Sequence, residues 1–239
     1  MTTFPRALIE VTIAAPAEEV WRSLRDKERI AQWFGWQYEG LEDGIDFIFI
    51  QRAKADDAAH TIQFGRGDRI ELEANDDNTC VLRIVRPAPS AEHDWDDIFE
   101  DETQGWIAFL TQLRFAVEQH PNDKRRTLFL AGSPRAANQP LAAEALGLPH
   151  SEISYGITAP TGDRLAGKVW HRGKHQVALT VDGIGLLVSM NRPADAKYPL
   201  GHSQVIFSTY GLSDQAYDDL AARWRAWWGQ HFDDAQPGR

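Results

Sequence analysis

The residues that could perform acid–base chemistry are scattered along the chain and do not form a known catalytic pattern. Such chemistry needs an ionisable side chain with a shifted pKa inside a pocket. None of the candidates stands at a spacing that defines a mechanism, and no Gly-X-Ser-X-Gly, Cys-X-X-Cys or His-Glu-X-X-His motif is present. We therefore expect no catalytic residue. The candidates in or near expected strands are His60, Arg69, Glu71, His93, His171, His175 and His202.

A run of seven carboxylates between residues 92 and 102 is a second candidate for chemistry. Calcium takes oxygen ligands, but Trp95, Ile98 and Phe99 interrupt the run, and no glycine stands where an EF-hand turn needs one. We expect an acidic loop ahead of a helix N-terminus, where negative charge is favourable. The same loop could dock a basic protein partner. No metal site and no cofactor are expected.

The aromatic and aliphatic residues offer a more specific pattern, because nine tryptophans are present and several stand at helical spacings. A long amphipathic helix over a strongly curved sheet can enclose an apolar cavity. The alternative is that these side chains pack together as an ordinary core. Phe47 and Phe49 are expected on one face of a strand, since side chains alternate with period two. The predicted cavity is lined by Trp33, Phe34, Phe47, Phe49, Phe64, Trp106, Phe109, Leu110 and Leu113.

The elements that must position these residues follow from periodicity and turn signals. In the first half, short helices are expected after Pro16 and from Lys27, and a long helix from Thr103 to His120. Pro121 ends that helix. The predicted strands of this half are Arg6–Ile13, Trp36–Leu41, Ile45–Gln51, His60–Phe64, Asp68–Ala74 and Cys80–Arg86.

The second half repeats this order of elements. A strand over Arg126–Ala131 should break at Gly132-Ser133-Pro134, and a helix over Asn138–Leu146 should follow. Ser213 should cap a last helix, whose stripe of Tyr217, Leu220, Ala221, Trp224 and Trp228 has the spacing of Trp106, Phe109, Leu110, Leu113 and Val117. This order indicates a diverged internal duplication, and two unrelated α+β halves are the alternative. The predicted strands are Ile153–Thr158, Arg164–Arg172, His175–Val181, Ile184–Met190 and Gln204–Tyr210.

Charge and composition limit the classes of partner that we expect for the chain. The net charge of −10 weighs against nucleic acid and against an anionic membrane surface. Residues 1–122 carry 24 acidic and 12 basic residues, whereas residues 123–239 carry 11 and 13, which favours two units. We expect domains at 1–121 and 125–232 and a flexible tail at 233–239. The chain has no apolar run long enough to span a membrane, no signal-peptide pattern and a single cysteine, Cys80, so a cytoplasmic location is expected.

Two motifs in the first half carry a family resemblance. The stretch from Ile13 to Trp21 (IAAPAEEVW), with Ile30 to Phe34 (IAQWF), resembles the opening of the START-like (SRPBCC) superfamily. The stretch from Gly105 to Leu113 (GWIAFLTQL) resembles its closing helix. Within that superfamily the chain is most similar to activators of the heat-shock protein 90 ATPase, over residues 6–120. The glycine-rich start of the strand after the second helix is replaced here by Leu41 to Ile45.

The resemblance implies an α+β fold of the helix-grip type, with a curved antiparallel sheet around a long C-terminal helix, here in tandem. It also implies an apolar cavity between sheet and helix. The leading hypothesis is a non-catalytic protein that binds a hydrophobic small molecule there, with a role in stress. One alternative is a co-chaperone that contacts an ATPase through the acidic first half. Another is a cyclase-type or hydrolase-type enzyme.

Overall fold

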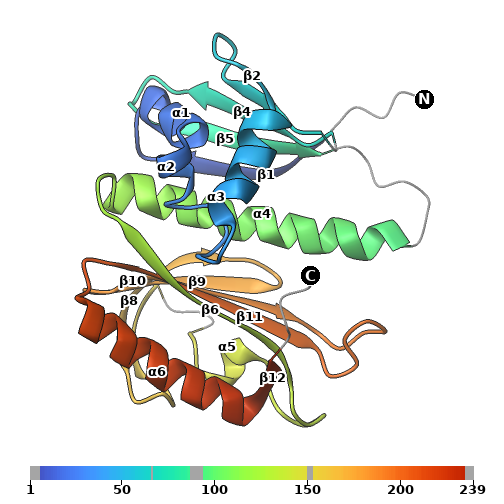
Figure 1. Ribbon diagram of the computed structural model, residues 1–239, viewed down its shortest axis with the longest axis vertical. Helices are drawn as coiled ribbons and strands as arrows, with labels where there is room; N and C mark the ends of the chain where they lie inside the picture. The colour runs from blue at the N-terminus through green and yellow to red at the C-terminus, as the bar shows by residue number, and fades with distance from the viewer. Residues whose placement is uncertain (1–5, 66, 87–93, 150–152, 235–239) are drawn as a thin grey trace. The chain divides into compact units, whose positions relative to one another are not determined.

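Two antiparallel sheets organise the chain, one in each of two compact units, residues 1–122 and 123–239. The structure is a computed structural model that describes residues 6–65, 67–86, 94–149 and 153–234 (Figure 1). Each unit begins with a strand and continues through short helices and further strands to a long helix, which one more short strand follows in the second unit. The fold is therefore α+β, with the element order of a helix-grip in tandem. No helix in the described residues is long and apolar enough to cross a membrane.

The first unit has a five-stranded sheet in the order β1-β5-β4-β3-β2. Four helical segments separate the first two strands in sequence, and helix α4 (Asp94–Gln119) closes the unit. In Figure 1, α4 runs along the sheet. The strands are β1 (Arg6–Ile13), β2 (Lys54–Asp56), β3 (Thr61–Gln63), β4 (Arg69–Ala74) and β5 (Cys80–Arg86), and the segments between β1 and β2 are α1 (Ala17–Arg25), α2 (Lys27–Ile30), α3 (Leu41–Ile45) and the π-helix η1 (Asp46–Gln51).

The core of this unit is where α4 meets the sheet. Leu110, Leu113 and Val117 on α4 are buried in one apolar cluster with Ile13 of β1 and Leu82 of β5. These helix positions belong to one stripe at offsets of three and four, which places them on a single face. The predicted stripe of α4 is therefore confirmed, and so are the predicted bounds of β1 and β5.

The strands predicted over Trp36–Leu41 and Ile45–Gln51 are wrong, because residues 36–40 are irregular or in a turn and residues 41–51 are helical in α3 and η1. The buried side chains of the segment are Leu41, Ile45 and Phe49. Their spacing of four residues is a helical stripe, whereas the prediction relied on the alternation of Phe47 and Phe49 with period two. A short apolar run fits either period, and here the longer spacing decided the structure.

The long helix begins earlier than predicted. Helix α4 starts at Asp94, so most of the run expected to be an acidic loop forms its first turns. Carboxylates are stabilised by the partial positive charge of a helix N-terminus, so an acidic run can form the first turns of a helix as well as precede them. Residues 92 and 93 lie outside the described residues.

The second unit has a seven-stranded antiparallel sheet in the order β12-β6-β11-β10-β9-β8-β7. Helix α6 (Asp214–His231) is the last helix of the unit, and Ser213 caps it by accepting a hydrogen bond from the Ala216 amide at 3.2 Å, as predicted. The buried face of α6 includes Leu220, Trp224 and Trp228. The other elements are β6 (Arg125–Pro134), α5 (Ala142–Ala145), β7 (Ser154–Thr158), β8 (Arg164–Arg172), β9 (Gln176–Val181), β10 (Gly185–Arg192), β11 (His202–Tyr210) and β12 (Phe232–Asp234).

The break predicted at Gly132-Ser133-Pro134 is wrong, because these residues continue β6 and pair with β12. Gly132 lies opposite Asp234 in this pairing. A Cβ atom at Gly132 would lie 2.1 Å from the Asp233 carbonyl oxygen, so a glycine is needed for the strands to approach. Asp233 and Asp234, expected in a flexible tail, therefore belong to the sheet, and residues 235–239 lie outside the described residues.

This close approach predicts the effect of adding one methyl group. Gly132→Ala should destabilise the protein by about 1–3 kcal/mol, because the backbone of β12 must move away. Gly156→Ala in β7 is the matched control, since a Cβ there meets nothing within 4 Å. Urea unfolding of the two variants measures the difference. Equal free energies of unfolding would show that β12 does not pair with β6 as described.

Candidate functional site

A chain of aromatic rings fills the space between α4 and the sheet of the first unit. The Phe34 and Phe49 ring centroids are 4.9 Å apart, those of Phe49 and Phe64 are 5.4 Å apart, and those of Phe64 and Trp106 are 5.5 Å apart. The Phe34 ring also lies 4.9 Å from that of Phe109. These separations are typical of favourable aromatic pairs. These five predicted lining residues are therefore brought together, and their rings contact one another.

Phe49 is the centre of this aromatic cluster. Its side chain is 1% exposed, and its ring meets those of Trp33, Phe34 and Phe64 edge-on. It comes from η1, whereas its neighbours come from the turn after α2 and the loop between β3 and β4. A π-helical turn is rare and occurs often at functional sites. A fully enclosed ring of the cluster is thus carried by a short π-helical segment outside the sheet.

Phe47 lies outside the cluster. Its side chain is 48% exposed, and the Arg52 guanidinium lies 4.9 Å from its ring centroid. The helical course of η1 places positions 47 and 49 on different faces, contrary to the strand predicted for them. The remaining predicted residues, Leu110 and Leu113, are buried in the same apolar cluster from the α4 side.

A buried polar network lies at the Trp106 end of the aromatic cluster. Arg86, 4% exposed, donates from Nε to Asp68 Oδ1 at 3.0 Å and from Nη1 to Thr103 Oγ1 at 2.8 Å. Its Nη2 forms an ion pair with Glu102. The Trp106 indole N–H donates to Asp68 Oδ2 at 3.2 Å. The network therefore joins β5 and the loop before β4 to α4 at Glu102, Thr103 and Trp106.

The predicted site residues do not include Asp68 and Arg86, although the register of one hairpin contains the signal for this pair. Strands β4 and β5 pair Ala74 with Cys80 and Arg69 with Val85. Counting one step further sets Asp68 opposite Arg86, and the period of two puts both on the face that carries Ile70 and Ile84. Opposite charges on facing positions stabilise a hairpin. The predicted turn at residues 75–78 was enough to find the pair.

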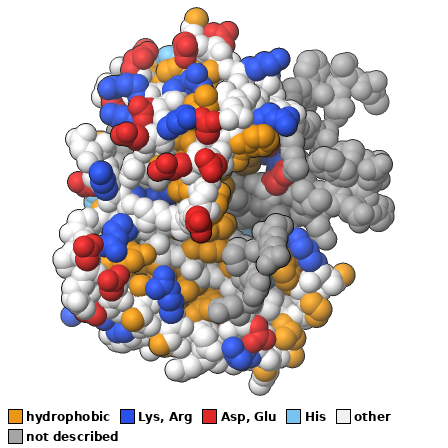
Figure 2. All heavy atoms as spheres, viewed as in Figure 1, with side chains coloured by type: hydrophobic (Ala, Val, Ile, Leu, Met, Phe, Trp, Pro, Cys, Tyr) orange, Lys and Arg blue, Asp and Glu red, His pale blue; other side chains and the backbone are white. Residues whose placement is uncertain are grey.

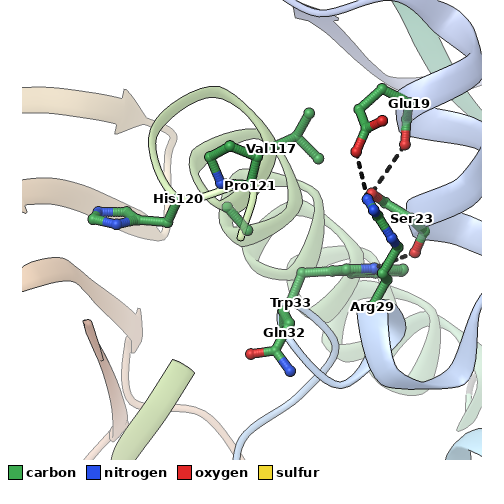
Figure 3. A pocket seen from close by; sticks show the side chains of 9 residues that line it. Glu19, Ser23, Arg29, Gln32, Trp33, Val117, His120 and Pro121 are labelled. Atoms are coloured by element: carbon green, nitrogen blue, oxygen red, sulfur yellow. Dashed lines mark hydrogen bonds and ion pairs between the residues drawn. The ribbon is translucent and has the colours of Figure 1, made fainter. Parts of the chain in front are cut away.

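A small pocket lies at the other end of α4, between that helix and helices α1 and α2 (Figure 3). Its volume of about 20 Å³ is room for about one water molecule. Arg29 pairs with Glu19, and the Trp33 indole N–H donates to the Ser23 carbonyl at 2.8 Å, so these polar groups have partners. The His120 ring points away from Glu19 and Arg29 in this view. The pocket is too small for an organic ligand.

His60, Arg69 and Cys80, candidates of the first unit, form ordinary contacts or are buried in its core. The His60 Nε2 atom lies 3.4 Å from Glu18 Oε1, and the His60 ring is tilted against that of Trp21, with ring centroids 5.0 Å apart. Arg69 pairs with Glu71 along one face of β4. Cys80 is buried, and burial raises the pKa of its thiol to about 11. His93 lies outside the described residues.

No group of three His, Cys, Asp or Glu side chains that could hold a metal ion occurs among the residues described. The side chains of residues 94–101 are outside that description. Glu102, the last carboxylate of the acidic run, pairs with buried Arg86 and so is used inside the unit. On the face of the first unit shown in Figure 2, acidic and basic side chains are interspersed, with hydrophobic side chains between them.

The second unit has a related polar anchor on its own helix. Trp224 of α6 donates its indole N–H to Asp163 Oδ2 at 2.9 Å, and Arg223 donates to Asp163 Oδ1 at 2.6 Å. The hydrogen bond to Asp163 raises the pKa of Arg223. Asp163 stands in the turn between β7 and β8. In both units, therefore, a carboxylate next to a strand start holds a tryptophan of the closing helix.

Comparison with known proteins gives distant structural likenesses. No protein-family model matches the chain, and no curated protein matches it. The di-domain ARO/CYC BexL from the BE-7585A biosynthetic pathway aligns with a TM-score of 0.39 and 14% identity, over 96% of this chain and 98% of that one. The di-domain ARO/CYC StfQ from the steffimycin biosynthetic pathway aligns with a TM-score of 0.35 and 13% identity, over 91% and 90%.

A third solved structure is DynU16, a protein of the dynemicin biosynthetic locus. It aligns with a TM-score of 0.28 and 16% identity, over 92% of this chain and 93% of that one. None of the three is described as an activator of the heat-shock protein 90 ATPase. Structural likenesses at these scores do not establish an activity for this chain.

The buried network predicts a difference between two arginines of β5. Arg86 and Arg83 each pair with two carboxylates, but the side chain of Arg86 is 4% exposed and that of Arg83 is 27% exposed. Arg86→Ala should cost about 3–5 kcal/mol, because it leaves Asp68 buried without its cation. Arg83→Ala should cost about 0–1 kcal/mol for each solvent-screened pair. Urea unfolding measures both, and equal losses would contradict the burial of the network.

Proposed function

We propose that the first unit binds a hydrophobic, ring-containing small molecule between α4 and the sheet. The observation that carries the proposal is the position of Phe49. Its ring occupies the centre of the aromatic cluster and is surrounded by three other rings, yet it belongs to a short π-helical segment outside the sheet. A flat ring of similar size fits the place that this ring fills, with the same edge-on contacts.

Access to this place follows from the segment that carries Phe49. Gly35 and Gly40 both precede the segment, with φ angles of +56° and +95°, a region in which glycine is not strained. Such residues absorb backbone rotation in hinge movements. On binding, the α3–η1 segment moves outward, the Phe49 ring leaves the cluster, and the ligand ring replaces it. The predicted lining residues other than Phe47 then become the ligand's surroundings.

A second candidate function is a cyclase-type reaction on the same kind of molecule. The observation that favours it is the Asp68 carboxylate, which lies beside the Trp106 and Phe64 rings and is 7% exposed. A buried carboxylate next to a bound ring can accept a proton from it, as general base catalysis requires. If the protein binds the molecule and releases it unaltered, the first function holds. If the protein converts the bound molecule into a different one, the second function holds.

The test of binding is a bulky substitution on α4. Leu110 is 1% exposed in the core between helix and sheet. Leu110→Trp should reduce the affinity for a naphthalene probe by about tenfold or more, because the indole occupies the space that the probe needs. Fluorescence titration of naphthalene against both proteins measures the affinity.

Phe47→Trp is the matched control, because it adds an indole at an exposed position of η1. This variant should bind naphthalene as the unaltered protein does. Unchanged affinity in Leu110→Trp, with circular dichroism showing a folded protein, would place the binding site elsewhere.

A further inference from the structure

Strand β7 differs from the other three strands that lie at the ends of the two sheets. Strands β1, β2 and β12 each contain charged residues, and β2 and β12 are only three residues long. Strand β7, with the sequence SYGIT, contains no charged residue and no proline. Charges, proline and shortness are what protect an edge strand from pairing with another chain. Among the strands that the structure describes, β7 is therefore the unprotected edge.

The backbone of β7 presents a row of hydrogen-bonding groups at this edge. At its two ends, the Ile153 carbonyl accepts from the Val169 amide at 3.0 Å, and the Ala159 amide donates to the Asp163 carbonyl at 2.9 Å. Alternate residues of an antiparallel strand bond to the same neighbour, so the odd-numbered residues of β7 bond to β8. The N–H and C=O groups of the even-numbered residues point away from β8. These outward-facing residues, all exposed, are Ser154, Gly156 and Thr158.

The outward-facing groups are complementary to themselves about Gly156. When two copies of β7 pair antiparallel with a two-fold axis at this residue, each Gly156 faces the other. Ser154 then faces Thr158 of the second copy, and Thr158 faces Ser154. Each facing pair exchanges two backbone hydrogen bonds, which gives about six in all. Ser and Thr side chains on facing positions can add hydrogen bonds of their own.

The apolar face of β7 continues across such a pair. Tyr155 and Ile157 are partly buried against the core of the second unit, whereas Ile153, next on the same face, is 82% exposed. In the two-fold register, Tyr155 lies opposite Ile157 of the second copy, and pairs of an aromatic and a β-branched side chain are favourable. Ile153 lies opposite Ala159 and diagonal to Ile157 of the second copy. The pairing therefore covers an apolar side chain that is otherwise in water.

Charge does not oppose this pairing. The whole chain has a net charge of −10, but residues 123–239 carry 13 basic and 11 acidic residues. The nearest bases, Arg164 and Lys168, are on β8, one strand in from the edge. In the pair they are three strand spacings, about 14 Å, from the same bases of the second copy. That separation exceeds the Debye length of about 8 Å at physiological salt, so their repulsion is screened.

We propose that the second unit forms a two-fold symmetric dimer with a second copy of this chain, by antiparallel pairing of β7 with β7 about Gly156. The two seven-stranded sheets then form one continuous sheet. A two-fold interface needs a surface that is complementary to itself. Strand β7 meets this need in its backbone hydrogen bonds and in its apolar face. Because each copy contributes one short strand, the dimer is weak and its amount rises with protein concentration.

Sedimentation velocity and amide exchange of the full-length chain test the dimer without any substitution. Between about 1 μM and about 1 mM protein, the fraction of dimer should rise. Over the same range, the amide protons of Ser154, Gly156 and Thr158 should exchange more slowly with solvent, because they become hydrogen-bonded. NMR measures these three exchange rates one by one.

Opposite charges at the two-fold axis test the register. A Cβ at Gly156 meets nothing within 4 Å, so the single chain has room for a longer side chain there. Gly156→Lys and Gly156→Glu each set like charges face to face in the dimer, which is destabilising. At low salt, each variant alone should dimerise about threefold or more weakly than the unaltered protein. An equal mixture of the two should recover the unaltered affinity, because a Lys then faces a Glu.

Gly229→Lys and Gly229→Glu are the matched controls. They add the same charges at an exposed position of α6, where a Cβ also meets nothing within 4 Å. Alone or mixed, these variants should change the dissociation constant of the dimer by less than about twofold, because the added charges do not face each other.

Three results would overturn the proposal. The first is a chain that stays monomeric at about 1 mM. Slow exchange of the three amides in that monomer would mean that another part of the same chain covers the edge, and fast exchange would leave the edge to a different protein. The second is a dimer in which the three amides exchange as fast as in the monomer. The third is a mixture of the Gly156 variants that dimerises no better than either alone. Should those variants fail to fold in a thermal melt, the amide exchange of the unaltered protein decides.

Discussion

The burial of one cation, Arg86, constrains the arrangement of the first unit. A guanidinium removed from water is costly unless it is paired and hydrogen-bonded. Asp68 supplies one partner from the neighbouring strand edge, and Glu102 and Thr103 supply the others from α4. Because these partners come from different elements, the charge can be satisfied only when the helix lies in one position over the sheet. That position also brings Trp106 to Asp68 and sets the end of the aromatic cluster.

The aromatic cluster is the place where we propose that the first unit binds its ligand. Most of its rings are anchored by regular elements or by the turn that follows α2, but Phe49 is carried by α3 and η1. A core ring on a separable segment differs from one on a central strand, because its removal need not disrupt the sheet's hydrogen bonds. Local segments of lower stability are those from which binding sites and lids are usually drawn. In the second unit, likewise, a tryptophan of the long helix, Trp224, donates a hydrogen bond to a carboxylate, Asp163.

The sequence predicts the regular elements well and the irregular segment poorly. The stripes of α4 and α6 and the bounds of β5 and β8 follow directly from periodicity. The segment 41–51 does not, because Phe47, Phe49 and their neighbours fit a strand as well as a helix. The pairing of Gly132 with β12 was missed because a glycine can mark either a break or a close approach.

In the candidate site, the apolar residues could be predicted from the sequence, whereas the buried ion pair was not. Hydrophobic residues that share a core are predictable from their faces, and all of those predicted except Phe47 lie in one cluster. The Asp68–Arg86 pair required the hairpin register to be followed to its open end, where charged residues are usually assigned to the surface. A buried ion pair is found only when both partners are considered together, since neither residue alone predicts burial.

The most direct test of the account follows the Phe49 ring itself. With 4-fluorophenylalanine incorporated at position 49, fluorine NMR reports whether that ring is enclosed or in water. The account predicts an enclosed signal in the free protein that shifts to a solvent-exposed position as naphthalene saturates the site. Saturation of the protein with an unchanged fluorine signal would contradict it, because the ligand would then be bound without replacing the ring.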